Sequence, residues 1–164
     1  MQMMGTLVLC GLVATTAMTS ILQASQGLGL SRISIMFLLG SLFSAERSRA
    51  MVIGFALYLL GGWAFAFVYF AFFNSIGIST WWFGGMVGFV HGLFLLVCAM
   101  PVLPYLHPRM ASEHHGVNAM RLLEPPGFLA MNYGYNTPLV VVTAQVVYGA
   151  VLGAGLQIQH MMHA

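Results

Sequence analysis

The chain has 164 residues, of which 60% are hydrophobic and only 5% are charged, and its mean hydropathy is +0.90. The five basic and three acidic residues fall within residues 32–49 and 109–124, so residues 1–31, 50–108 and 125–164 contain no Lys, Arg, Asp or Glu. A soluble domain needs far more surface charge than this, and a net charge of +2 is too small for a nucleic-acid surface. The composition therefore predicts a protein in contact with a lipid bilayer and excludes nucleic acid as a partner.

Four segments are long and apolar enough to cross a membrane. About 20 helical residues span the roughly 30 Å hydrocarbon core of a bilayer. The predicted spanning helices cover about residues 3–22, 50–73, 81–100 and 139–158. Residues 33–43 are also apolar but too few to cross, which indicates one short interfacial or re-entrant helix. The predicted fold is an all-α, polytopic membrane protein with a single transmembrane domain.

The ends of these helices carry polar and helix-breaking residues. Ser44 is positioned to cap the second spanning helix. Pro101, Pro104 and Pro108 are expected to kink or end the third one, because proline lacks a backbone N–H donor. Residues 107–137 then form the only long polar connection in the sequence.

The arginines give the orientation. All five lie in or beside the connections after the first and third crossings, and the turn after the second crossing has none. Short connections rich in arginine remain on the cytoplasmic side of a membrane. The pattern predicts a multi-pass protein of the bacterial inner membrane with both termini outside.

Glycines recur at every fourth position in two of the predicted helices. They are Gly84, Gly88 and Gly92 in the third crossing and Gly149 and Gly153 in the fourth. Small residues at this spacing let membrane helices approach each other closely. The main interpretation is helix packing, and a ligand groove is the alternative.

His91 lies about halfway along the third crossing. Ionisable groups inside a membrane are costly and mark candidate functional sites. At its depth the other helices offer Thr15, Thr16, Gln145 and Tyr148, which predicts an intramembrane polar cluster. The main interpretation of His91 is a neutral side chain that is hydrogen-bonded between helices. The alternatives are proton or solute handling and ligation of haem or a metal.

The polar connection contains weak candidates for metal ligands. His107, Glu113, His114 and His115 offer imidazole and carboxylate groups, which suit zinc, copper or iron. Their spacing matches no recognised metal motif, so a solvated interfacial loop is the main interpretation and no cofactor is expected. The chain has no Asp, and its three Glu lie outside the crossings. A carboxylate pair for acid–base catalysis inside the membrane is therefore excluded, and no catalytic residue is assigned.

Two stretches carry a resemblance to other membrane proteins. The sequence from Gly11 to Thr19 (GLVATTAMT) and that from Gly88 to Gly92 (GFVHG) resemble those of small four-helix bacterial inner-membrane proteins of unknown function. The resemblance covers these stretches and the order of apolar segments. It implies four helices and the bacterial inner membrane, and it transfers no activity and no site residue.

Three functions are compatible with these patterns. Minimal charge, little mass outside the membrane, and abundant aromatic and glycine faces favour a non-catalytic accessory or assembly subunit of a larger membrane complex, whose partners are other membrane subunits. The first alternative is a small transporter or proton-handling protein centred on His91. The second is a component of a membrane oxidoreductase that binds haem or copper.

Overall fold

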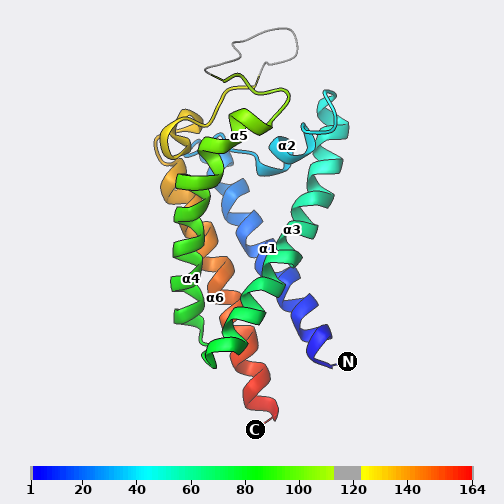
Figure 1. Ribbon diagram of the computed structural model, residues 1–164, viewed down its shortest axis with the longest axis vertical. Coiled ribbons are helices and arrows are strands. Elements are labelled where there is room, and N and C mark those ends of the chain that lie inside the picture. The colour runs from blue at the N-terminus through cyan, green and yellow to red at the C-terminus, as the bar shows by residue number, and fades with distance from the viewer. Residues whose placement is uncertain (1, 113–122, 164) are drawn as a thin grey trace.

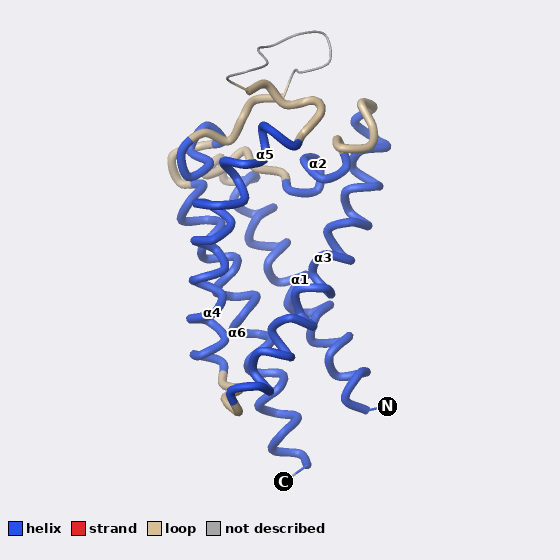
Figure 2. Tube along the Cα trace, in the orientation of Figure 1, coloured by secondary structure: helices blue, strands red, loops and turns tan. Residues whose placement is uncertain are grey.

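The chain forms a bundle of long helices, shown by a computed structural model that describes residues 2–112 and 123–163 (Figure 1). The elements are α1 (Gln2–Gly27), α2 (Ile35–Gly40), α3 (Arg47–Ile76), α4 (Trp81–Phe94), η1 (Leu95–Ala99), α5 (Met100–Leu106), η2 (Phe128–Tyr133) and α6 (Thr137–His163). Loops lie at the two ends of the bundle, and the described part contains no strand (Figure 2). The predicted all-α fold with four helices able to cross a membrane is confirmed.

Each crossing is longer than the sequence predicted. The four apolar helical segments are Met4–Gly27, Arg47–Ile76, Trp81–Leu106 and Thr137–Met162. Thirty residues of α3 extend over about 45 Å, which exceeds the roughly 30 Å of hydrocarbon and leaves helical turns in the headgroup layers. The interfacial helix is shorter than predicted, because only Ile35–Gly40 is helical within residues 33–43.

The third crossing continues through two of the prolines that were expected to end or kink it. Pro101 lies in the first turn of α5, where a missing N–H donor costs little. The preceding turn, η1, is a π-helix, and Pro104 lies inside α5. The helix ends only at Leu106, with His107 as its C-cap.

The cap of α3 also differs from the prediction. Glu46 is the N-cap residue: its backbone is extended, and its carbonyl oxygen accepts the first helical hydrogen bond from Ala50. Ser44 instead accepts a hydrogen bond from the backbone N–H of Glu46 at 3.2 Å, in the turn before the helix. The assignment of Ser44 as the cap is therefore wrong, because an additional turn separates it from the helix.

Helix α6 is the central element. The buried share of the most apolar stretch is 50% in α6, compared with 33% in α1 and 22% in both α3 and the α4–α5 segment. It packs against α4 and α1 along most of its length and touches α3. The outer three helices therefore leave most of their surface for lipid or for other proteins.

The two ends of the bundle differ in polarity. The N- and C-termini lie at the same end, and the connections that precede α2, α3 and η2 lie at the other (Figure 1). Arg32, Arg47, Arg49 and Arg109 all belong to this second end. There Arg32 donates a hydrogen bond to the carbonyl oxygen of Asn132 at 2.6 Å, which ties two connections together.

Candidate functional site

A seam of glycines joins α4 to α6. Gly84, Gly88 and Gly92 lie buried on one face of α4. A methyl group at Gly84 would meet the carbonyl oxygen of Gly149, and one at Gly153 would meet the carbonyl oxygen of Thr80. The structure thus brings the five predicted packing glycines together, with backbone in direct contact with backbone.

A second small-residue contact joins three helices in the interior. The Tyr148 hydroxyl of α6 donates a hydrogen bond to the Gly62 carbonyl oxygen of α3 at 2.6 Å. Thr15 of α1 lies against the same glycine, where its side chain occupies the place that a Cβ would take. Because Gly62 has no side chain, Thr15 of α1 and Tyr148 of α6 can both reach the α3 backbone at this point.

His91 contacts α3, and the expected partners on α1 and α6 are wrong. Its Nδ1 is 3.1 Å from the Tyr69 hydroxyl oxygen, and its ring lies 4.5 Å from that of Phe65, centroid to centroid. The reason is geometric: successive helical residues are about 100° apart, so His91 cannot share the direction of Gly92, which faces α6. His91 Nε2 is buried and has no hydrogen-bond partner among the described residues.

The predicted polar cluster is consequently divided. Thr16 is exposed, and its hydroxyl donates to the Leu12 carbonyl oxygen of its own helix at 2.8 Å. Thr15, Gln145 and Tyr148 are buried but do not bond His91. The aromatic ring of Tyr69 connects the two groups, because it meets the ring of Tyr148 edge-on at 5.6 Å.

Sequence reasoning missed the role of Tyr69. The buried residues of α3 are Ala50, Gly54, Tyr58, Gly62, Ala66, Tyr69 and Phe73. They recur every three or four residues and define one face of the helix. This spacing is the signal that identifies the buried tyrosines.

The structure describes only one of the four candidate metal ligands, His107. Glu113, His114 and His115 lie outside the described residues, and no group of three or more His, Cys, Asp or Glu side chains occurs within them. His107 is fully buried, with 1% of its surface exposed. Its Nε2 lies 3.1 Å from both the Ser41 hydroxyl and the Leu38 carbonyl oxygen. Its role is to hold the α2 turn against the end of α5.

The hydrogen bonds of His107 define its neutral tautomer. Nδ1 accepts a hydrogen bond from the backbone N–H of Arg109 at 3.2 Å, so the ring proton is on Nε2 and is donated towards α2. Burial lowers the pKa of His107 below its usual value of 6.5, and the nearby Arg109 charge lowers the pKa further, against the contact with Leu38. This side chain is therefore uncharged at neutral pH.

Stability is expected to depend on pH through His107. The unfolded chain binds this proton more readily than the folded one, so the contribution is complete above about pH 6.5 and is lost as the pH falls towards the lowered pKa. The loss is at most about 1.4 kcal/mol per pH unit for one proton. Thermal unfolding of detergent-purified protein at about pH 7.5 and pH 5 measures it. His107→Gln should reduce the pH dependence, and an unchanged dependence would contradict the assignment.

Comparison with known proteins identifies no relative. No protein-family model, no curated protein and no solved structure matches the chain. The resemblance to small four-helix inner-membrane proteins therefore remains an expectation from two short stretches of sequence.

Proposed function

We propose that this multi-pass membrane protein is a non-catalytic accessory or assembly subunit of a larger complex in the bacterial inner membrane. The observation that supports this proposal is the exposure of the outer helices. In α3 and in the α4–α5 segment, only 22% of the most apolar stretch is buried within the chain. Exposed aromatic side chains such as Phe55, Phe67 and Phe89 lie on these faces. They suit either lipid or the packed surface of a neighbouring subunit.

The chemistry of the interior also favours a structural role. The buried polar side chains in the middle of the helices are neutral, among them Thr15, Gln145 and Tyr148. Both Glu residues within the described chain, Glu46 and Glu124, lie at the end of the bundle that carries the arginines. Neutral polar groups between helices suit helix packing, whereas acid–base catalysis needs a positioned proton donor or acceptor.

Extraction from the native membrane tests the proposal. A tagged chain is solubilised under mild conditions, separated by size, and its companions are identified by mass spectrometry. We expect this 17.8 kDa chain to migrate with defined, stoichiometric membrane subunits. Tagging one of those subunits should recover this chain in return. Migration as an isolated chain with lipid alone would contradict the proposal.

We also propose that both termini lie on the outer side of the membrane. The support is the collection of Arg32, Arg47, Arg49 and Arg109 at the end opposite the termini. In a variant without Cys10 and Cys98, an impermeant thiol reagent added from outside should label Ser75→Cys and spare Ala45→Cys. Labelling of the second position alone would reverse the orientation.

A second candidate is proton or solute handling at His91. The observation that favours it is the buried, unpartnered Nε2 beside the His91–Tyr69 pair, seen within the described residues. Purified protein in proteoliposomes would then move protons, and His91→Gln would abolish the flux.

Ligation of haem or copper by His91 is the remaining alternative, and it predicts a visible absorption band or bound metal in the purified protein. His107 does not fit the second ligand of such a site, because both of its ring nitrogens are engaged.

A further inference from the structure

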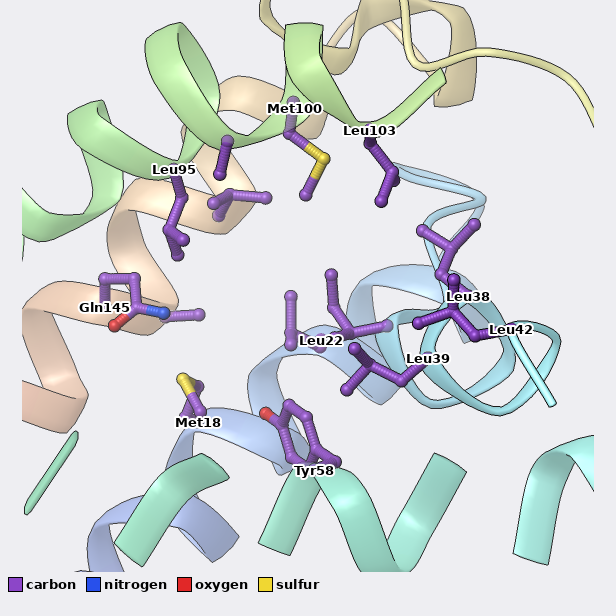
Figure 3. Close-up of a pocket in the computed structure, with 14 residues that line it drawn as sticks. Met18, Leu22, Leu38, Leu39, Leu42, Tyr58, Leu95, Met100, Leu103 and Gln145 are labelled. Carbon is purple, nitrogen blue, oxygen red and sulfur yellow. The ribbon is translucent and has the colours of Figure 1, made fainter. Parts of the chain in front are cut away.

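A partly open cavity of about 210 Å³ lies in the half of the bundle that contains α2. Its wall is almost entirely apolar and is formed by α1, α2, α3, the η1–α5 segment and α6 (Figure 3). Leu39, Leu95 and Leu103 line it and are only half-buried, and the long helices around it are membrane spans. An engineered apolar cavity of about 150 Å³ binds benzene, so this one has room for several methylene groups of a lipid.

The cavity follows from two close backbone contacts on either side of it. Glycines hold α4 against α6, and a methyl group at Gly40 of α2 would meet the Ala50 carbonyl oxygen of α3. The two pairs of helices therefore form separate walls, and α3 diverges from the α4–α5 segment towards the end that contains α2 (Figure 1). The widest part of the bundle is thus at the end that carries the arginines.

Two of these arginines have no carboxylate partner within the described residues. Arg32 and Arg49 form ion pairs with glutamates, at 3.6 Å and 2.8 Å respectively. Arg47 and Arg109 form none in the part of the chain that the structure describes. An unpaired guanidinium group suits a phosphate, to which it can donate two parallel hydrogen bonds.

Both unpaired arginines contact the helix that forms one wall of the cavity. The Arg47 guanidinium lies over the Phe37 ring of α2, 5.6 Å from its centroid. The Arg109 guanidinium donates a hydrogen bond to the carbonyl oxygen of Ser41, the residue that follows α2. This bond uses one of the five N–H donors of the arginine. Positive charge therefore lies at the α2 end of the cavity.

The depth of the cavity matches the length of one lipid leaflet. Arg47 begins α3, and Tyr58 of the same helix lines the cavity. At about 1.5 Å per residue the two are about 16 Å apart along the helix axis. One leaflet contributes about half of the roughly 30 Å hydrocarbon core. An acyl chain whose headgroup lies at Arg47 therefore reaches the level of the cavity.

We propose that the cavity binds one acyl chain of an anionic phospholipid, whose phosphate headgroup lies against Arg47 and Arg109. The apolar wall takes the chain, and the two guanidinium groups supply the charge that the headgroup needs. A zwitterionic phospholipid offers the same chain but also carries an ammonium group, which the arginines repel, so it binds more weakly. This inference is independent of whether the protein is a subunit of a complex.

Photolabelling in phosphatidylcholine vesicles that contain the full chain tests the inference. Two probes carry the same diazirine near the end of one acyl chain, and their headgroups are phosphatidylglycerol and phosphatidylcholine. At low and equal concentration we expect the anionic probe to label the cavity segments around Leu22 and Leu103 about fivefold more, as expected for one basic residue near an anionic lipid. Labelling around Leu60, which is exposed on α3, should be equal for the two probes.

Two substitutions in the first turn of α3 test the headgroup contact. Arg47→Gln and Arg49→Gln each remove one positive charge, so they change the net charge equally. Arg49 is already paired with Glu46, so only Arg47→Gln should lower the preference for the anionic probe towards equality. Arg109 is left unchanged, because it also bonds Ser41.

A second matched pair tests the acyl chain. Ala99→Phe adds a ring to the cavity wall and should reduce cavity labelling by both probes, whereas Ala56→Phe, at an exposed position of α3, should not. Because the arginine pair leaves the wall intact, it decides the proposal even if Ala99→Phe is unstable. Equal cavity labelling by the two probes, equal effects of the two arginine substitutions, or labelling that persists in Ala99→Phe would overturn the proposal.

Discussion

Gly88→Leu is expected to destabilise the bundle strongly. A Cβ at this position would meet the Gln145 carbonyl oxygen of α6, and backbone cannot move aside as a side chain can. Overpacking a filled interior typically costs about 1–3 kcal/mol, and we expect a cost at the top of this range or above it. Thermal unfolding in detergent, together with the yield of monodisperse protein, measures the effect.

Gly61→Leu is the matched control. Gly61 is also a helical glycine in a spanning segment, but a Cβ there would have no atom within 4 Å among the described residues. The control should unfold at nearly the temperature of the parent protein. Equal losses in both variants would show that α4 and α6 do not meet through the glycine seam.

Gly54→Ala is also expected to destabilise the bundle, although it adds only one methyl group. That methyl would meet the Met36 carbonyl oxygen, so α2 must move away from α3. We expect a loss of about 2 kcal/mol or more in the free energy of unfolding.

Gly61→Ala is the control for this second substitution. On the same helix and without a neighbour at the Cβ position, it should be neutral or stabilise α3 by up to about 1 kcal/mol, since alanine favours helix more than glycine does. If Gly54→Ala behaved in the same way as this control, the close contact between α2 and α3 would be wrong.

The spans could be predicted because charge and hydropathy are so unevenly distributed. Helix ends could not, since they depend on local hydrogen bonds that the hydropathy pattern does not contain. Glu46 rather than Ser44 begins α3 because an additional turn lies between them. Pro101 does not end the third crossing, because it falls in a first turn after the π-helical segment.

The candidate site could be predicted only in part, for a rotational reason. Depth along a helix follows from counting residues, so Thr15, Gln145 and Tyr148 were identified as interior groups. The pairing of His91 with Tyr69 depends on how α4 is rotated about its axis. The glycine face determines that rotation, because it must face α6. The glycine spacing identifies the face of α4 that contacts α6. His91 comes directly before Gly92, so it lies about 100° away from that face and points to a different helix.

The orientation of α4 on α6 directs His91 to Tyr69. A disulfide tests it most directly. The Cβ position at Gly85 lies 3.9 Å from Ala150 Cβ, within the range of about 3.5–4.5 Å that disulfides require. In a variant without Cys10 and Cys98, Gly85→Cys combined with Ala150→Cys should form an intramolecular disulfide in membranes under mild oxidation. Free thiols in that pair, or a disulfide in the control pair Gly61→Cys and Ala150→Cys, would contradict this arrangement.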